Sequence, residues 1–204
     1  MADIKNIVFD FGGVLMDWNP RYFYRDYFND EAEMEYFLSE ICNDEWNAEN
    51  DRGRSFEEGT RILQEKFPQY REAIGLYGEK WPCMLKGEFP ESVEMLRRLK
   101  GMGYGIYGLT NWSAETIGIA YSRHDFFRLF DGIVVSGEEK VIKPEPGIYK
   151  ILLERYGLKA EESVFIDDNR ANIAAAANLG FMTIHFDSLE LSLIHISEPT
   201  RLDV

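Results

Sequence analysis

Short apolar runs alternate with helix-like segments through most of this 204-residue chain. Each run is bounded by Gly, Asp or Asn, as strands are. The runs cover residues 7–9, 104–109, 133–135, 164–166 and 182–186. Apolar residues recur at helical spacing in residues 91–102, 148–156 and 171–179, each followed by glycine. This alternation predicts an α/β fold with a doubly wound parallel sheet, whose apolar strands are covered by helices on both faces.

Residues 16–87 break this alternation. Apolar residues there recur at three- and four-residue steps, and no run has the character of a strand. We therefore expect a helical cap at 16–87, inserted into a core made of residues 1–15 and 88–191. Residues 192–204 lack helical periodicity and contain Pro199, and they resemble a peptide produced by sequencing-adapter read-through. We interpret them as a non-native tail.

The composition limits the partners and the compartment. The chain has 36 acidic and 22 basic residues, a net charge of -14, which repels nucleic acid and anionic lipid. No apolar run approaches the ~20 residues of a membrane span, and residues 7–9 are too short for a signal-peptide core. Cys42 and Cys83 have no metal-ligand spacing, and we expect both to be buried. These features predict a cytoplasmic protein, either a monomer or a weak homodimer, with neither nucleic acid nor membrane as a partner.

Polar residues follow two of the predicted strands. Asp10 comes directly after residues 7–9, and Thr110 and Asn111 follow residues 104–109. In an open parallel sheet, ligands bind beyond the carboxyl ends of the strands, so these are candidate site residues. Each also has a structural alternative, because Asp10 can form an Asx-turn and Thr110 can cap the next helix.

Two later segments add charge. Lys143 precedes Pro144 and is a candidate fixed cation, although an ordinary surface lysine is the alternative. Asp167 and Asp168 follow residues 164–166. Adjacent carboxylates at a strand end repel each other, and a hard divalent cation such as Mg²⁺ relieves that repulsion.

Taken in order, these segments resemble the four motifs of the haloacid dehalogenase-like (HAD) hydrolase superfamily. The motifs are Phe9-Asp10-x-Gly12-x-Val14, Thr110-Asn111, Lys143-Pro144, and Phe165-x-Asp167-Asp168-x-x-x-Asn172-Ile173 followed by Gly180. The resemblance covers essentially all of residues 5–187. Within the superfamily the chain is similar to small phosphatases with a helical cap, such as the bacterial glucose-1-phosphate phosphatase type. It implies a Rossmann-like core.

The resemblance also implies a reaction, the hydrolysis of a small phosphate monoester such as a sugar phosphate. Asp10 attacks phosphorus and forms an aspartyl-phosphate, which water then hydrolyses. Thr110, Asn111 and Lys143 hold the phosphoryl oxygens, and Thr110 and Lys143 also act in catalysis by stabilising charge.

Magnesium is implied as the cofactor, held by Asp10, the backbone carbonyl of Gly12 and Asp168, with Asp167 acting through water. Phosphatases of this superfamily usually carry a second Asp, two positions after the nucleophile, that protonates the leaving oxygen. Gly12 occupies that position here, so the usual donor is absent. General acid–base catalysis is worth ~10²–10⁴-fold, so we expect slow turnover or dependence on good leaving groups.

Two other functions stay open. A 2-haloacid dehalogenase uses the same Asp nucleophile on carbon without a metal, although such proteins usually have an aromatic residue in place of Gly12 and lack the acidic pair. A non-catalytic binder of phosphorylated metabolites would explain the missing acid, but the residues that serve catalysis are retained.

Aromatic residues of the insertion are candidates for stacking on a sugar ring, although packing between helices is the favoured interpretation. They are Trp18, Tyr22, Phe23, Trp46 and Trp81. We expect neither His124 nor His185 to be catalytic, and we expect His185 to lie away from the motifs.

Overall fold

The protein is described here by a computed structural model that covers residues 3–187. Within this range a five-stranded sheet has the order β5-β4-β1-β6-β7, and every neighbouring pair is parallel. The strands are β1 (Asn6–Phe9), β4 (Gly105–Thr110), β5 (Gly132–Val135), β6 (Ser163–Asp167) and β7 (Met182–His185). The predicted doubly wound sheet is confirmed, and each predicted strand end lies within one residue of the observed one.

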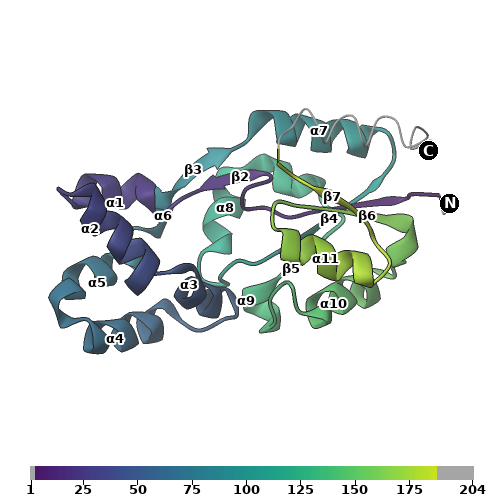
Figure 1. The fold of residues 1–204 in the computed structure, drawn as a ribbon. Coiled ribbons are helices and arrows are strands. Elements are labelled where there is room, and N and C mark those ends of the chain that lie inside the picture. The colour runs from purple at the N-terminus through teal and green to yellow at the C-terminus, as the bar shows by residue number, and fades with distance from the viewer. Residues whose placement is uncertain (1–2, 188–204) are drawn as a thin grey trace.

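Helices cover both faces of this sheet (Figure 1). On one face lies α7 (Pro90–Gly101), together with α8 (Ile117–Arg123) and a 3₁₀ turn (Asp125–Leu129); on the other lie α10 (Pro146–Tyr156) and α11 (Arg170–Asn178). Side chains alternate along a strand, so Ile7 and Phe9 of β1 enter the first core cluster and Val8 enters the second. Burial on both faces explains why the sequence of β1 is apolar throughout.

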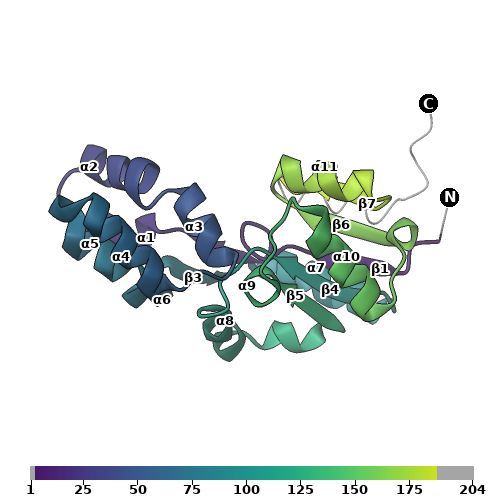
Figure 2. The same cartoon turned by 90° about the horizontal axis from the view of Figure 1, so that it is seen from below.

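A second layer of helices stands beside the sheet (Figures 1 and 2), and we call it the cap. It comprises α1 (Arg21–Tyr27), α2 (Glu31–Tyr36), a π-helical turn (Phe37–Ile41), α3 (Asp44–Asp51), α4 (Phe56–Lys66), a 3₁₀ turn (Pro68–Tyr70), α5 (Arg71–Glu79) and α6 (Trp81–Met84). Aromatic side chains hold these helices together: the ring centroid of the buried Tyr24 lies 4.9 Å from that of Phe37 and 6.1 Å from that of Tyr77.

The connections between the sheet and the cap form a two-stranded ribbon. We expected no strand in residues 16–87, and this is wrong, because β2 (Met16–Trp18) pairs antiparallel with β3 (Leu85–Glu88). Both strands are short, and β3 contains Lys86 and Gly87, so neither gives a run of apolar residues in the sequence. Their pairing depends on the cap, which brings its two ends together.

Three further points follow from the structure. Cys42 is buried as expected, but Cys83 is exposed, so the prediction of two buried thiols is wrong for Cys83. Among the helices of residues 3–187, none combines the length and the apolar character that crossing a lipid bilayer demands. The tail predicted at 192–204 lies outside the described residues.

Candidate active site

The predicted site residues meet at the carboxyl edge of the sheet. Asp10 follows β1, Thr110 ends β4 and Asp167 ends β6. Lys143 lies in the loop between the short helix α9 (Ser136–Glu139) and α10. The strand order reverses direction at β1, and ligands bind at such a switch point in open α/β sheets.

Asp10 keeps one carboxylate oxygen free. Its Oδ1 accepts hydrogen bonds from the backbone N–H of Phe11 (2.7 Å) and lies 2.8 Å from Lys143 Nζ. No donor among the described residues bonds to its Oδ2. Burial raises the pKa of Asp10, Lys143 acts in the opposite direction, and the nearby Asp167 raises the pKa further. An oxygen without a donor on a fixed carboxylate is suited to act as a nucleophile or as a ligand.

Lys143 is a buried cation between two carboxylates. Its side chain is 0% exposed, and Nζ lies 2.8 Å from Asp10 and 2.7 Å from Asp167. Burial acts to lower the pKa of Lys143, but the two carboxylates outweigh burial and the pKa is raised. The ordinary surface lysine considered as an alternative is therefore excluded.

Asn111 holds the backbone of Lys143. Its Oδ1 accepts from Lys143 N (2.8 Å), and its Nδ2 donates to the Lys143 carbonyl (3.0 Å). Both polar groups of this side chain are thus engaged with the lysine loop. The geometry makes the side chain of Asn111 a positioning group for Lys143.

Asp167 is surrounded by donors. Its Oδ1 accepts from the backbone N–H of Asn169 (2.7 Å) and from Asn172 (3.1 Å), and its Oδ2 accepts from Lys143 (2.7 Å) and Asn172 (3.1 Å). The side chain is completely buried. With two donors on each oxygen, Asp167 chiefly fixes Lys143 in place.

Asp168 approaches the loop that follows Asp10, and Gly13 makes the approach possible. A Cβ on Gly13 would lie 2.2 Å from Asp168 Oδ2, and Gly13 has a φ of +72°, which favours glycine. The ring of His185 also reaches this segment, with Nε2 2.9 Å from the Asp168 carbonyl. The expectation that His185 lies away from the motifs is wrong, because β7 pairs with β6 and places His185 opposite Asp167.

Three carboxylates form a group that fits a divalent cation. Oxygens of Asp10, Asp167 and Asp168 all lie within 4.8 Å of one another. Lys143 offsets one of the three negative charges, which leaves two for a cation to balance. Burial raises the pKa of Asp168, and the charge of Asp167 raises it further. Oxygen ligands of this kind suit Mg²⁺.

Thr110 offers a hydrogen-bonding group with no partner of its own. The residue is completely buried, and its Oγ1 has no hydrogen-bond partner among residues 3–187. Buried polar atoms are normally paired, and an unpaired one at a candidate site calls for an explanation. A bound oxygen atom at the sheet edge would satisfy the Thr110 hydroxyl.

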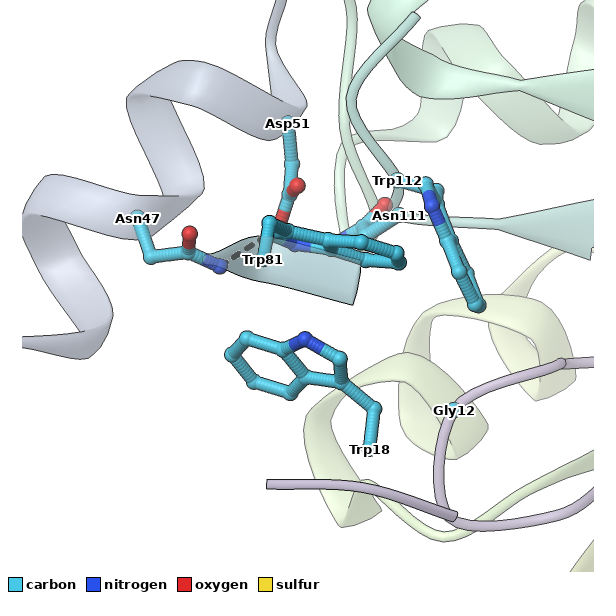
Figure 3. Close-up of a pocket in the computed structure, with 7 residues that line it drawn as sticks. All are labelled: Gly12, Trp18, Asn47, Asp51, Trp81, Asn111 and Trp112. Atoms are coloured by element: carbon cyan, nitrogen blue, oxygen red, sulfur yellow. Dashed lines mark hydrogen bonds between the residues drawn. The ribbon is translucent and has the colours of Figure 1, made fainter. Parts of the chain in front are cut away.

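A cavity of about 110 Å³ opens beside these residues, between the core and the cap (Figure 3). It is lined by Gly12, Trp18, Asn47, Asp51, Trp81, Asn111 and Trp112. Gly12 and Asn111 closely follow Asp10 and Thr110 in sequence, so the cavity adjoins the group of charged residues. It has room for a compact organic group.

Indole rings form much of the cavity wall. Trp18 and Trp81 are stacked with centroids 6.4 Å apart, and Trp112 lies 5.5 Å from Trp81. The indole nitrogens of Trp18 and Trp112 are buried and have no acceptor among the described residues. Trp46, in contrast, donates to the Gly59 carbonyl (3.2 Å) and packs between cap helices. Flat apolar walls suit a compact ring.

Several residues that line the cavity or shape the loop after Asp10 were not singled out by the sequence analysis. Asp51 and Asn47 belong to the cap, and Trp112 lies one residue beyond the second motif, so no local pattern joins them. The sequence does contain an indication for Gly13, because it is the second of two consecutive glycines in Asp10-Phe11-Gly12-Gly13. Gly12 has no positive φ, and a Cβ built on it meets no atom of the described residues within 4 Å. The glycine that the backbone requires is therefore Gly13.

Comparison with known proteins finds hydrolases. The family model described as haloacid dehalogenase-like hydrolase matches residues 4–180. The chain is 31% identical over 192 residues to the sesquiterpene phosphatase astK of Aspergillus oryzae, covering 91% of each chain. It is also 28% identical over 99 residues to the (S)-2-haloacid dehalogenase 4A of Burkholderia cepacia, covering 48% of this chain and 43% of the dehalogenase.

A solved structure shares the fold. A predicted HAD-like family hydrolase from Porphyromonas gingivalis superposes with a TM-score of 0.72 at 26% identity, and the match covers 99% of this chain and all of the other. The similarity includes the helical cap as well as the sheet, because the coverage is nearly complete.

Proposed function

The chain belongs to the haloacid dehalogenase-like hydrolase family, and on that premise we propose that it is a magnesium-dependent phosphatase acting on a small phosphate monoester. The observation that supports this most strongly is the group formed by Asp10, Lys143, Asp167 and Asp168 at the sheet edge. The cavity favours a compact leaving group such as a sugar, since about 110 Å³ is far below the ~300 Å³ at which sites for drug-sized ligands begin.

In this proposal each residue has a defined task. The free Oδ2 of Asp10 attacks phosphorus and forms an aspartyl-phosphate. Thr110 Oγ1 donates to a phosphoryl oxygen, which gives that buried hydroxyl its partner. Lys143 balances negative charge beside Asp10, and Asn111 and Asp167 keep it there. Water then attacks the aspartyl-phosphate and releases inorganic phosphate.

Mg²⁺ would be held by Asp10, Asp168 and the Gly12 carbonyl, with Asp167 acting through water. The ion supplies charge screening between the phosphate and the attacking carboxylate. Asp167 suits an indirect role, because each of its oxygens already accepts two hydrogen bonds.

The acidic pair also bears on the dehalogenase alternative. A dehalogenase acts on a carbon–halogen bond without a metal, and it has no use for three carboxylates within 4.8 Å of one another. A divalent cation explains why such a group is maintained. The cluster of three carboxylates therefore favours the phosphatase over the dehalogenase.

A screen of phosphate monoesters with and without Mg²⁺ tests the proposal. We expect phosphate release that requires Mg²⁺ and disappears in Asp10→Asn and Asp168→Asn. Asp125→Asn is the matched control, because Asp125 is an exposed carboxylate on the 3₁₀ turn behind the sheet. Full phosphate release in excess chelator would refute the metal assignment. Halide release from a 2-haloacid, with no phosphatase activity, would show the dehalogenase to be correct.

A further inference from the structure

The proposed reaction needs a proton for the leaving oxygen, and the motif residues do not provide one. Gly12 has no side chain, and Lys143 already contacts two carboxylates. Asp51 is the only titratable residue that lines the cavity within the described part of the chain. It is the last residue of α3, so it reaches the cavity from the cap.

We propose that Asp51 is the general acid and base of this site, supplied by the cap in place of the absent motif carboxylate. The inference rests on the proposed phosphatase function. In Figure 3 the side chains of Asp51 and Asn47 project from α3 toward Trp81 and Asn111, and Gly12 lies on the other side of the indole rings. The same cavity is lined by Asp51 and by Gly12 of the loop that follows Asp10, so a compact leaving group bound there would be within reach of both.

The side chain of Asp51 is oriented by a neighbour. Asn47, one turn earlier on α3, donates from Nδ2 to Asp51 Oδ2 (3.2 Å). No side-chain donor among the described residues bonds to Oδ1. Asn47 therefore fixes one oxygen of Asp51, and no side chain of residues 3–187 donates to the other.

The backbone of Asp51 is attached to the core. Ser136, the first residue of α9, donates from Oγ to the Asp51 carbonyl (2.6 Å) and accepts from the backbone N–H of Trp112 (2.9 Å). Lys140 adds a second contact, from Nζ to the Gly53 carbonyl (3.2 Å). These bonds fix the end of α3 relative to the loop that follows Thr110. Catalytic groups have to be held this closely, because small displacements cost large factors in rate.

The surroundings of Asp51 favour its protonated form, so that proton loss falls near neutral pH. Burial raises the pKa of Asp51 to about 7, and a hydrogen bond from the backbone of Ser113 acts in the opposite direction. Tyr77 is the titratable neighbour, and it is buried and neutral. Charged side chains on the elements packed against α3 are exposed or engaged with other groups: Glu40, Asp44, Glu45, Glu49, Arg54, Glu57, Glu58, Glu115, Glu138, Glu139 and Lys140.

With Asp51 as acid and then base, the bonds and protons balance in both the formation and the hydrolysis of the aspartyl-phosphate. In the first, Asp10 forms the new P–O bond, the ester P–O bond breaks with its electron pair on the leaving oxygen, and protonated Asp51 delivers a proton that makes the alcohol. Asp51 is then a carboxylate. In the second, that carboxylate removes a proton from water as the water oxygen bonds to phosphorus, the P–O bond to Asp10 breaks with its electron pair on the Asp10 carboxylate, and inorganic phosphate leaves. Both residues return to their starting states.

The two steps give Asp51→Asn a distinctive kinetic signature. With p-nitrophenyl phosphate, whose leaving group needs little protonation, we expect a burst of one nitrophenol per enzyme followed by slow turnover. With a sugar phosphate we expect no burst and a kcat lower by roughly 10²–10⁴-fold. The fall of wild-type kcat above about pH 7 on the sugar phosphate should vanish in the variant. Glu45→Gln is the control, because Glu45 is an exposed carboxylate on the same helix.

The outcomes separate this inference from the function on which it rests. A wild-type protein that hydrolyses neither ester contradicts the phosphatase proposal itself. An active wild type, together with an Asp51→Asn variant that turns over both esters at wild-type rates, overturns the role of Asp51. Equal losses on both esters without a burst, or a change in KM alone, would also overturn it, since a structural or binding role predicts those results. Circular dichroism confirms that the variant is folded.

Discussion

The two glycines after Asp10 differ in what they allow. Gly13 has a φ of +72°, and an added Cβ would meet Asp168 Oδ2 at 2.2 Å. Gly12 has ordinary backbone geometry and open space around it. The family resemblance drew attention to Gly12 as the site of a missing acid, whereas the backbone conformation makes Gly13 the residue that has to be glycine.

Alanine at each position distinguishes these roles. Gly13→Ala should displace Asp168 and so disturb the three carboxylates proposed to hold Mg²⁺. Because strain at such a backbone position also costs of order 1–3 kcal/mol, we expect phosphatase activity to fall by at least about tenfold. Gly12→Ala should keep the wild-type melting temperature. Steady-state kinetics and thermal denaturation provide the two measurements. Equal behaviour of the two variants would contradict this view of the loop.

Asp51 should also make the stability of the folded protein depend on pH. Its pKa is about 7 in the folded protein against 3.8 for the ordinary carboxyl group, so the folded state binds the proton more tightly. The resulting stabilisation is complete below about pH 3.8 and is lost as the pH rises through about 7. Asp51→Asn does not titrate, so its melting temperature should rise relative to wild type between about pH 4 and pH 8. A difference that is constant with pH would show that the pKa of Asp51 is not raised.

Among the elements, α9 is small but occupies a central position. Its four residues directly follow β5, and Ser136 bonds both to the cap at Asp51 and to the backbone of Trp112. The same loop region continues to Lys143, which Asn111 holds. One short helix therefore connects the cap with two of the motif segments.

Removing the Ser136 hydroxyl should loosen this connection. Ser136→Ala leaves the Asp51 carbonyl and the Trp112 N–H without their partner, which we expect to destabilise the protein by about 1–3 kcal/mol. Turnover of a sugar phosphate should fall more than that of an aryl phosphate, because Asp51 loses its position. Ser122→Ala, at an exposed serine of α8, is the comparison. The idea fails if Ser136→Ala denatures at the same urea concentration as wild type.

At the scale of the whole molecule, the sheet and its motifs were predictable and the cavity was not. Apolar runs that end in Asp10, Thr110 and Asp167 identify strands and their active edge, because parallel strands place their carboxyl ends together. The cavity depends on how the cap packs, which brings Asp51 to the same cavity as Trp112 from a distant part of the sequence. Short pairing segments such as β2 also carry too little apolar pattern to be found.

Magnesium should stabilise the folded protein as a whole. A ligand that binds only the native state adds about 2.7 kcal/mol at a concentration 100 times its Kd, so Mg²⁺ should raise the melting temperature. Asp168→Asn should abolish that increase, while Asp125→Asn should preserve it. An increase of equal size in all three proteins would place the bound ion elsewhere.

The central claim is that Asp10 takes the phosphoryl group, and trapping that intermediate tests it most directly. Asp51→Asn is mixed with p-nitrophenyl phosphate and Mg²⁺, quenched in acid during the burst, digested and analysed by mass spectrometry. We predict a peptide heavier by one phosphoryl group, with the modification on Asp10, and no such peptide from protein that also carries Asp10→Asn. Nitrophenol release without phosphorylation of Asp10, or with the phosphoryl group on another residue, would contradict the account.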